Sequence, residues 1–372
     1  MGGNPLALLQ PVLDLLVQEA AVLPASGRAV VELAMPSPGE IYDREANPET
    51  RVQGIWETDP DRLYRLVPPL HRWESHGLRF FARGSTRVFF LGTLLEHERS
   101  TPIQIAQIGV AVLERQGDGA IGMPREAVET RTALVMDTKE LSDDLRTAIE
   151  RAMPQGYGLW NSGLDATSNE PRLKGARKAN QEMRQLVLQV VSGLKWDRAA
   201  WLVLGQSLGK EFTSWPGPPL IGVVQEFRQD VLFRFQRQGR SLYQLLAELP
   251  SEARTAVFPR ESQGHRGKIV YWYIRIRNAR GLDFPLAGVV QVEMPNSGGD
   301  KVDTALVDHL SRHVVAERTV APYGSGPAWH SQLYPLHLVE KVVQGRFHSE
   351  EVVKAGLRWK LPDLRQVFAS NG

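Results

Sequence analysis

The 372-residue chain contains no cysteine. This absence excludes disulfides, zinc sites built from thiolates and cysteine nucleophiles. The sequence also has no apolar run of about 18 residues, so we expect no membrane-spanning helix. Its first residues lack the basic flank of a signal peptide and carry Asp14 and Glu19. A cytoplasmic protein without membrane contact is the simplest expectation.

The chain also has no large excess of positive or negative charge. The net charge is +2 at pH 7, so no strong overall field attracts nucleic acid. Basic residues nevertheless gather in three stretches, each of which is either a solvated face or part of a surface for a phosphate backbone. These stretches hold Arg172, Lys174, Arg177, Lys178 and Arg184, then Arg234, Arg237 and Arg240, then Arg275, Arg277 and Arg280.

Hydrophobic periodicity predicts one large domain with alternating strands and helices. Expected strands cover 29–35, 77–98 (two strands joined at Gly84-Ser85), 102–115, 130–140, 201–204, 220–227, 269–278 and 285–295. Expected helices cover 1–23, 141–153, 173–194, 241–254, 303–318 and the stretch after Tyr334-Pro335, with Ser142 and Asp303 as N-caps. The order predicts an α/β fold with a mixed central sheet flanked by helices.

The expected N-terminal helix has one apolar face, which either packs on the chain's own core or docks on a second copy or a partner protein. We therefore separate residues 1–35, a helix and strand that form a possible docking element, from a main domain of residues 36–372 with helical insertions. The apolar face comprises Leu6, Leu9, Val12, Leu15 and Leu16.

The stretch GQSLG, residues 205–209, matches the nucleophile elbow G-x-S-x-G of serine hydrolases. An elbow needs a helix directly after the serine, but three prolines lie within twelve residues of Ser207. No HGGG-type oxyanion segment precedes it, and nothing selects a triad histidine. A serine hydrolase that uses Ser207 is the weakest of our hypotheses.

Six stretches occur in a fixed order along the chain: RFFARGSTRVFFLG, RKANQEMR, WLVLGQSL, PLIGVVQEF, IVYWYIRIRN with VVQVEMP, and YPLHLVEKV. In this order they resemble the NurA nucleases, RNase H-like proteins that work with the hexameric HerA translocase at DNA ends. The resemblance runs from about residue 78 to 355. It implies an RNase H-like mixed sheet, a HerA-like ATPase partner, a homodimer, and a role in DNA end resection and repair or in DNA defence.

The resemblance also implies metal-binding positions, and several of them are changed here. The family's first strand ends in Asp-Gly-Ser, where this chain has Arg83-Gly84-Ser85. Gly205 replaces the second aspartate, so GQSLG is better interpreted as an altered Asp-Gly-Ser-Leu than as an elbow. Gln225 stands at a lysine position and Lys341 at a histidine position, whereas Glu182 matches the family's helix glutamate.

These replacements predict that the nuclease site is impaired or lost. Mn²⁺ and Mg²⁺ need anionic oxygen ligands, and two-metal cleavage needs several of them. Gly205 has no side chain, and a guanidinium repels a divalent ion by about 8 kcal/mol at 4 Å and an effective dielectric constant of 20. Arg83 can instead hold a DNA phosphate. Mn or Mg would bind only if a site survives, with Glu182 as the retained ligand.

An active nuclease with shifted carboxylates is the main alternative. It would use Asp137, Glu182 and Glu226, although solvated carboxylates at strand ends explain the same residues. Tyr334 and His337 could act on a leaving group, or His337 could be a capping or surface residue.

DNA contact is expected from basic side chains and from one aromatic strand. In the strand Tyr271-Trp272-Tyr273, one face belongs to the core and the other either does so too or stacks on bases. The expected phosphate contacts are Arg83, Arg177, Lys178, Arg184, Arg275 and Arg277.

Overall fold

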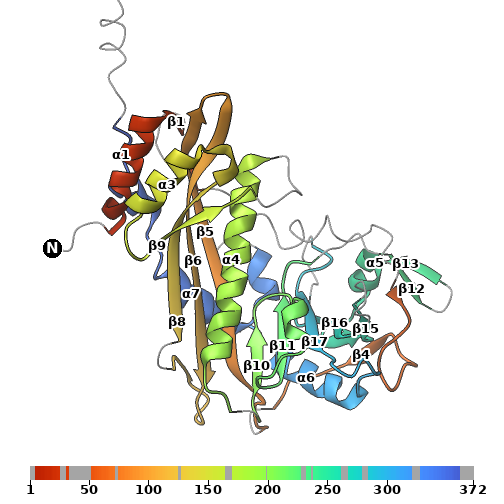
Figure 1. The fold of residues 1–372 in the computed structure, drawn as a ribbon. Coiled ribbons are helices and arrows are strands. Elements are labelled where there is room, and N and C mark those ends of the chain that lie inside the picture. Colours follow the sequence, from red (N-terminus) through yellow and green to blue (C-terminus); the bar gives the residue numbers. More distant parts are fainter. Residues whose placement is uncertain are drawn as a thin grey trace, which may run out of the picture.

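One large mixed sheet with helices on both faces forms the body of the molecule, as the computed structural model shows in Figure 1. The predicted α/β class is therefore confirmed. The structure describes residues 5–25, 31–32, 52–71, 74–124, 127–163, 170–197, 199–227, 232–235, 238–260, 267–278, 284–320 and 327–360.

The sheet is built around three parallel neighbours, β5 (Leu78–Glu96), β10 (Trp201–Leu204) and β11 (Leu220–Val224). From edge to edge its order is β4 (Tyr64–Leu66), β14 (Ala253–Thr255), β16 (Ile269–Arg275), β17 (Val289–Pro295), β11, β10, β5, β6 (Arg99–Arg115), β8 (Val128–Met136) and β9 (Tyr157–Asn161). Short strands extend it: β1 (Ala21–Pro24) and β2 (Val31–Glu32) on β5, β7 (Ile121–Gly122) on β6, and β15 (Phe258–Pro259) on β16. A second sheet holds β13 (Gln238–Ser241), β12 (Leu232–Phe235) and β3 (Val52–Gln53).

Helices on the two faces enclose separate cores. On one face α4 (Pro171–Gly193) buries Leu186 and Val187 against Phe80 and Ala82 of β5. On the other, α6 (Thr304–Ala316) and α7 (Tyr334–Gln344) pack over Phe81 and its neighbours. The remaining helices are η1 (Pro5–Leu9), α1 (Gln10–Glu19), η2 (Thr138–Glu140), α3 (Asp143–Ala152), η3 (Lys210–Phe212), α5 (Leu242–Ala247), η4 (Pro327–Ser331) and α8 (Glu350–Gly356).

The prediction of two strands between residues 77 and 98 is wrong, because β5 is one strand with an irregularity between Phe90 and Gly92. Gly84-Ser85 is not a turn. A Cβ on Gly84 would lie 2.0 Å from Sδ of Met183 and 3.0 Å from Cγ2 of Val187. The glycine therefore serves the close approach of α4 to the sheet.

The N-terminal helix packs on the chain's own core. Leu6, Leu9, Val12 and Leu16 are buried, and their cluster includes side chains of β5, β6 and β8. The face that we considered for docking is therefore covered within the chain, although the domain division itself stays a prediction. Of the strand expected at 29–35, only β2 lies within the described residues.

The expected N-caps are confirmed, but the helix expected over 1–23 ends at Glu19, and Ala21–Pro24 form strand β1 instead. The side chains of Ser142 and Asp303 accept hydrogen bonds from backbone N–H groups as N-caps of α3 and α6. The helix expected at 241–254 is shorter, because α5 ends at Ala247. The guanidinium of Arg275 donates to the carbonyls of Leu246 and Leu249, each at 2.6 Å. It thereby provides hydrogen bonds to backbone carbonyls at the point where the helix ends. None of the described helices is long and apolar enough to span a bilayer.

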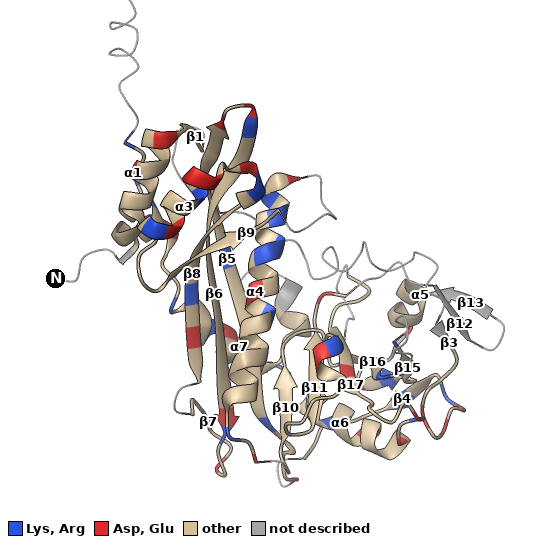
Figure 2. Cartoon of the chain, in the orientation of Figure 1, with Lys and Arg blue, Asp and Glu red and all other residues tan. Residues whose placement is uncertain are grey.

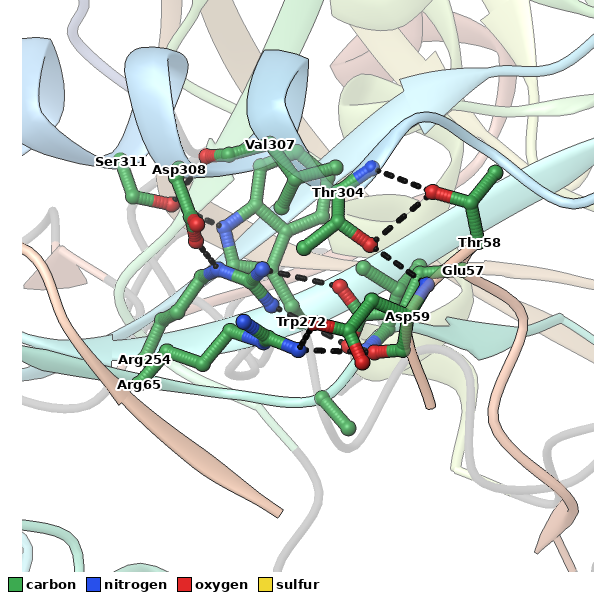
Figure 3. A network of polar contacts seen from close by, with 12 residues as sticks. Glu57, Thr58, Asp59, Arg65, Arg254, Trp272, Thr304, Val307, Asp308 and Ser311 are labelled. Carbon is green, nitrogen blue, oxygen red and sulfur yellow. Dashed lines mark hydrogen bonds and ion pairs between the residues drawn. The ribbon is translucent and has the colours of Figure 1, made fainter. Parts of the chain in front are cut away.

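A buried polar network connects the segment before β4 to β14 and α6 (Figure 3). Arg254 and Glu57 are both fully buried, with Nη2 and Oε2 2.8 Å apart. Nε of Arg254 also lies 2.6 Å from Asp308, and the indole N–H of Trp272 donates to Ser311 at 2.9 Å. These contacts join four segments of the chain: the one before β4, β14, β16 and α6.

His313 on α6 gives the fold a predicted pH dependence. It is 1% exposed, and burial lowers its pKa, although the hydrogen bond to the backbone of His309 partly offsets this lowering. Below pH ~6.5 the unfolded chain binds a proton that the native imidazole resists, so the free energy of unfolding falls as the pH falls through this range. In urea denaturation, His313→Gln should reduce the loss between about pH 7.5 and about pH 5.5. Equal losses in both proteins would refute this assignment.

Candidate functional site

Three positions that carry the resemblance come together on neighbouring parallel strands. Leu204 pairs with Ala82 on one side and with Gly222 on the other, so Arg83 and Gly205 lie side by side. Gln225 follows directly on the end of β11. Strand alternation directs Arg83 to the face covered by α7, opposite to α4. The site therefore lies at the carboxyl ends of β10 and β11, under α7.

The Arg83 side chain fills the centre of this site. Its Nη1 donates to Oε1 of Gln225 at 3.2 Å and lies 3.7 Å from Oε2 of Glu340 on α7. A Cβ on Gly205 would lie 3.0 Å from both Cγ and Cδ of Arg83. The arginine stem thus occupies the space that a side chain at position 205 would need.

This set of groups does not fit Mn²⁺ or Mg²⁺. It offers a guanidinium, an amide and a single carboxylate that is already paired with the guanidinium, whereas hard cations require several anionic oxygens. Over the described part of the chain, no three His, Asp or Glu side chains gather as cation ligands.

The first turns of α7 add a mixed group of polar side chains beside Arg83. Tyr334 begins the helix and is 49% exposed. Burial lowers the pKa of His337, and Lys341 and Arg83 lower it further. Lys341 is exposed one turn later. Their charges make the site cationic rather than acidic, with Glu340 as the counter-charge.

The carboxylates of the proposed shifted site are not brought together. Glu182 lies on α4, across the sheet from Arg83, and pairs with Lys178 at 2.6 Å. Asp137 caps η2 by accepting from the N–H of Lys139 at 3.1 Å. Strand register places Asp137 roughly 30 Å along the strand direction from Arg83. Glu226 is exposed after β11.

Ser207 has a different environment from that of an elbow serine. Its hydroxyl lies 3.0 Å from both carboxylate oxygens of Glu293 and 3.2 Å from Nη2 of Arg260. Among the described residues, no histidine bonds to it. The three-residue η3 follows instead of an α-helix, and Ser207 does not have positive φ. Two geometric requirements of an elbow are therefore unmet.

Glycine at position 222 of β11 allows the loop after β10 to pass close to the strand. A Cβ there would lie 2.7 Å from the carbonyl oxygen of Gln206 and 2.9 Å from Cγ of Leu208. Because the backbone would have to shift, Gly222→Ala should lower the free energy of unfolding by about 1–3 kcal/mol. Gly117→Ala, where the added Cβ meets no atom within 4 Å, is the matched control and should be near neutral in thermal melts. Equal effects would mean that the loop is not held as described.

The basic residues of α4 form a stripe along its first half, which Figure 2 shows in blue. Lys178 is half-buried and paired with Glu182, and Arg177 is half-buried. Arg184 donates to the carbonyl of Ser207 at 3.0 Å, and burial lowers its pKa. Arg184 thus supports the loop after β10 rather than standing free in solvent.

The expected phosphate contacts on β16 are placed differently from the prediction. Arg275 is 3% exposed and donates to backbone carbonyls, so it is not at the surface. Arg277 donates to Thr319 at 2.6 Å and lies over the ring of Trp329. The side chains of Arg234, Arg237, Arg240 and Arg280 are outside the described residues.

The aromatic strand belongs mainly to the core. Trp272 is fully buried on one face and Tyr273 is 3% exposed on the other, while Tyr271 is half-buried against Phe258 and Tyr273. Core packing thus accounts for both faces, which leaves at most Tyr271 for a stacking role.

Two acidic residues of the region escaped the sequence analysis. Glu293 is fully buried in β17 and pairs with Arg260 beside Ser207. A carboxylate inside the apolar run VVQVEMP was the available signal, because a buried charge needs a partner. Glu340 gave no such signal, since an acidic residue on an amphipathic helix is ordinarily solvated.

Comparison with known proteins gives no match: no protein-family model fits the chain, and no curated protein is similar to it.

Proposed function

We propose that the chain is a NurA-like subunit for DNA end processing or DNA defence, which acts with a HerA-like hexameric ATPase. It contacts DNA and its partner, as a homodimer, but its nuclease site is impaired or lost. One observation carries the proposal: three of the positions that carry the resemblance, Arg83, Gly205 and Gln225, meet at one site, with the Arg83 side chain over Gly205.

A guanidinium at this point favours phosphate binding over metal binding. Arg83 is 23% exposed, and its counter-charge Glu340 is 3.7 Å away on a partly exposed helix face. A DNA phosphate can compete for such a loosely paired guanidinium through charge-assisted hydrogen bonds.

The test is an assay with end-labelled linear duplex DNA and Mn²⁺. We expect the wild-type protein to bind the DNA without cutting it. Arg83→Gln should weaken binding and reduce the slope of log affinity against log salt by about 0.9, the value for one phosphate contact. Lys301→Ala, at an exposed lysine with no hydrogen bond or ion pair among the described residues, is the control.

Three results would contradict the proposal. Cleavage that disappears in Glu182→Ala or Asp137→Ala would favour an active nuclease with shifted carboxylates. Labelling of Ser207 by a fluorophosphonate probe would favour a serine hydrolase. Identical salt slopes for the wild type and Arg83→Gln would remove Arg83 from the DNA contact.

A further inference from the structure

Two tryptophans line a pocket beyond the end of α4, at the amino ends of β10 and β11, whereas the Arg83 site lies at their carboxyl ends. The pocket has a volume of about 420 Å³ and lies between Leu194, Lys195 and Trp196 and the loop of Trp215, Pro216 and Pro218. That loop precedes β11, whereas Gln225 follows it. The length of β11 therefore separates the pocket from the Arg83 site by about 15 Å.

Both indole rings are held in place by the chain itself. The Nε1–H of Trp196 donates to the carbonyl of Val191 at 2.6 Å, and its ring meets Phe80 edge to face at 4.8 Å. The Nε1–H of Trp215 donates to the carbonyl of Pro218 at 2.9 Å. Because both donors are used internally, the rings offer rigid apolar surface to a ligand at little entropic cost.

One charged side chain, Lys195, lines the pocket. Lys195 is exposed and has no ion-pair partner among the described residues. The nearby Asp197 is held away from Lys195 in an ion pair, 2.9 Å from Nη1 of Arg79, which also pairs with Glu114. The pocket therefore suits a ligand with a flat apolar part and an anionic part.

We propose that this pocket binds a nucleobase of single-stranded DNA, stacked on Trp215 with the adjoining phosphate on Lys195. Every base has a π-face, so stacking on a tryptophan does not depend on sequence. A proline-rich peptide also suits aromatic grooves. Here, however, both indole N–H groups already donate to carbonyls of the chain and cannot bind those of a peptide. The inference rests on the proposed function, to which it adds a separate single-strand site.

The test compares the full-length protein and its variants in fluorescence anisotropy with labelled dT12, blunt duplex DNA and a proline-rich peptide. Trp215→Ala should weaken dT12 binding about tenfold or more, and Trp215→Phe should restore much of it. Lys195→Ala, at an exposed position where misfolding is not expected, should reduce the salt slope for dT12 by about 0.7. Lys301→Ala should leave the affinity for dT12 and its salt slope unchanged. Duplex binding should stay at the wild-type level in all of these variants.

The outcomes separate this inference from the proposed function. If the wild type binds duplex DNA but dT12 binding is absent or indifferent to Trp215→Ala and Lys195→Ala, the inference is wrong and the function stands. Peptide binding that is lost in Trp215→Ala while dT12 binding persists would assign the pocket to a protein partner. Tight binding of free dTMP, with no gain from dT12, would assign it to a nucleotide. Failure to bind any DNA would overturn both proposals.

Discussion

Replacing Arg254 by alanine is expected to lower the free energy of unfolding by about 3–5 kcal/mol. The substitution leaves the carboxylate of Glu57 fully buried without its partner, which lies 2.8 Å away in the native protein (Figure 3). It also removes the contact of Arg254 with Asp308 and so disconnects β14 from α6. Urea denaturation at neutral pH measures the loss.

The matched control is Arg318→Ala, which breaks a partly exposed pair with Glu252. Exposed pairs contribute at most about 1 kcal/mol. The double variant Arg254→Met/Glu57→Gln should recover much of the stability, because it leaves no unpaired buried charge. A loss in Arg254→Ala no larger than in Arg318→Ala would mean that the network is solvated in the native protein.

The second large effect is a gain of metal affinity in the double variant Arg83→Asp/Gly205→Asp. It removes a charge that repels a divalent ion by about 8 kcal/mol at 4 Å, and adds two carboxylates beside the freed Glu340. We expect the affinity for Mn²⁺ to rise at least about a hundredfold, since each 1.4 kcal/mol is a factor of ten. Electron paramagnetic resonance of free Mn²⁺ during a titration gives the affinity.

Two variants control for shape and for linkage between the positions. Arg83→Asn/Gly205→Asn has the same shape without charge and should bind no Mn²⁺. Gly205→Asp alone should also fail, because its Cβ would lie 3.0 Å from the stem of Arg83 and its carboxylate would pair with the guanidinium. Tight Mn²⁺ binding by the wild type, or none by the aspartate pair, would contradict the account.

The parts of the fold that follow from local pattern could be predicted from the sequence. Apolar residues at helical spacing predicted the helix at 173–194, and the residues just before two other helices predicted the caps Ser142 and Asp303. The structure confirms all three. Long-range packing could not be read in this way. Gly84 was predicted to be a turn residue, because the sequence does not show that α4 packs closely against it. The apolar face of α1 likewise does not show which residues cover that face.

In the candidate site, too, the local patterns were predictable from the sequence and the long-range contacts were not. That Arg83, Gly205 and Gln225 belong together followed only from the order of motifs, and the strand register then supplied their adjacency. The burial of Arg275 was not predictable, because the carbonyls that it satisfies come from two other segments, α5 with its loop and the stretch before β17. Asp137 and Glu182 resembled ligands by type, but their distance from the site depends on register and on which face carries α4.

A crystal of the wild-type protein soaked in Mn²⁺ tests the central claim most directly. We expect the anomalous difference map to show no peak beside Arg83 and Gly205, with the guanidinium still bonded to Gln225. Two Mn²⁺ peaks between these strands, with Arg83 turned away from Gln225 and carboxylates as ligands, would contradict the claim that an arginine has taken the place of the metal ions.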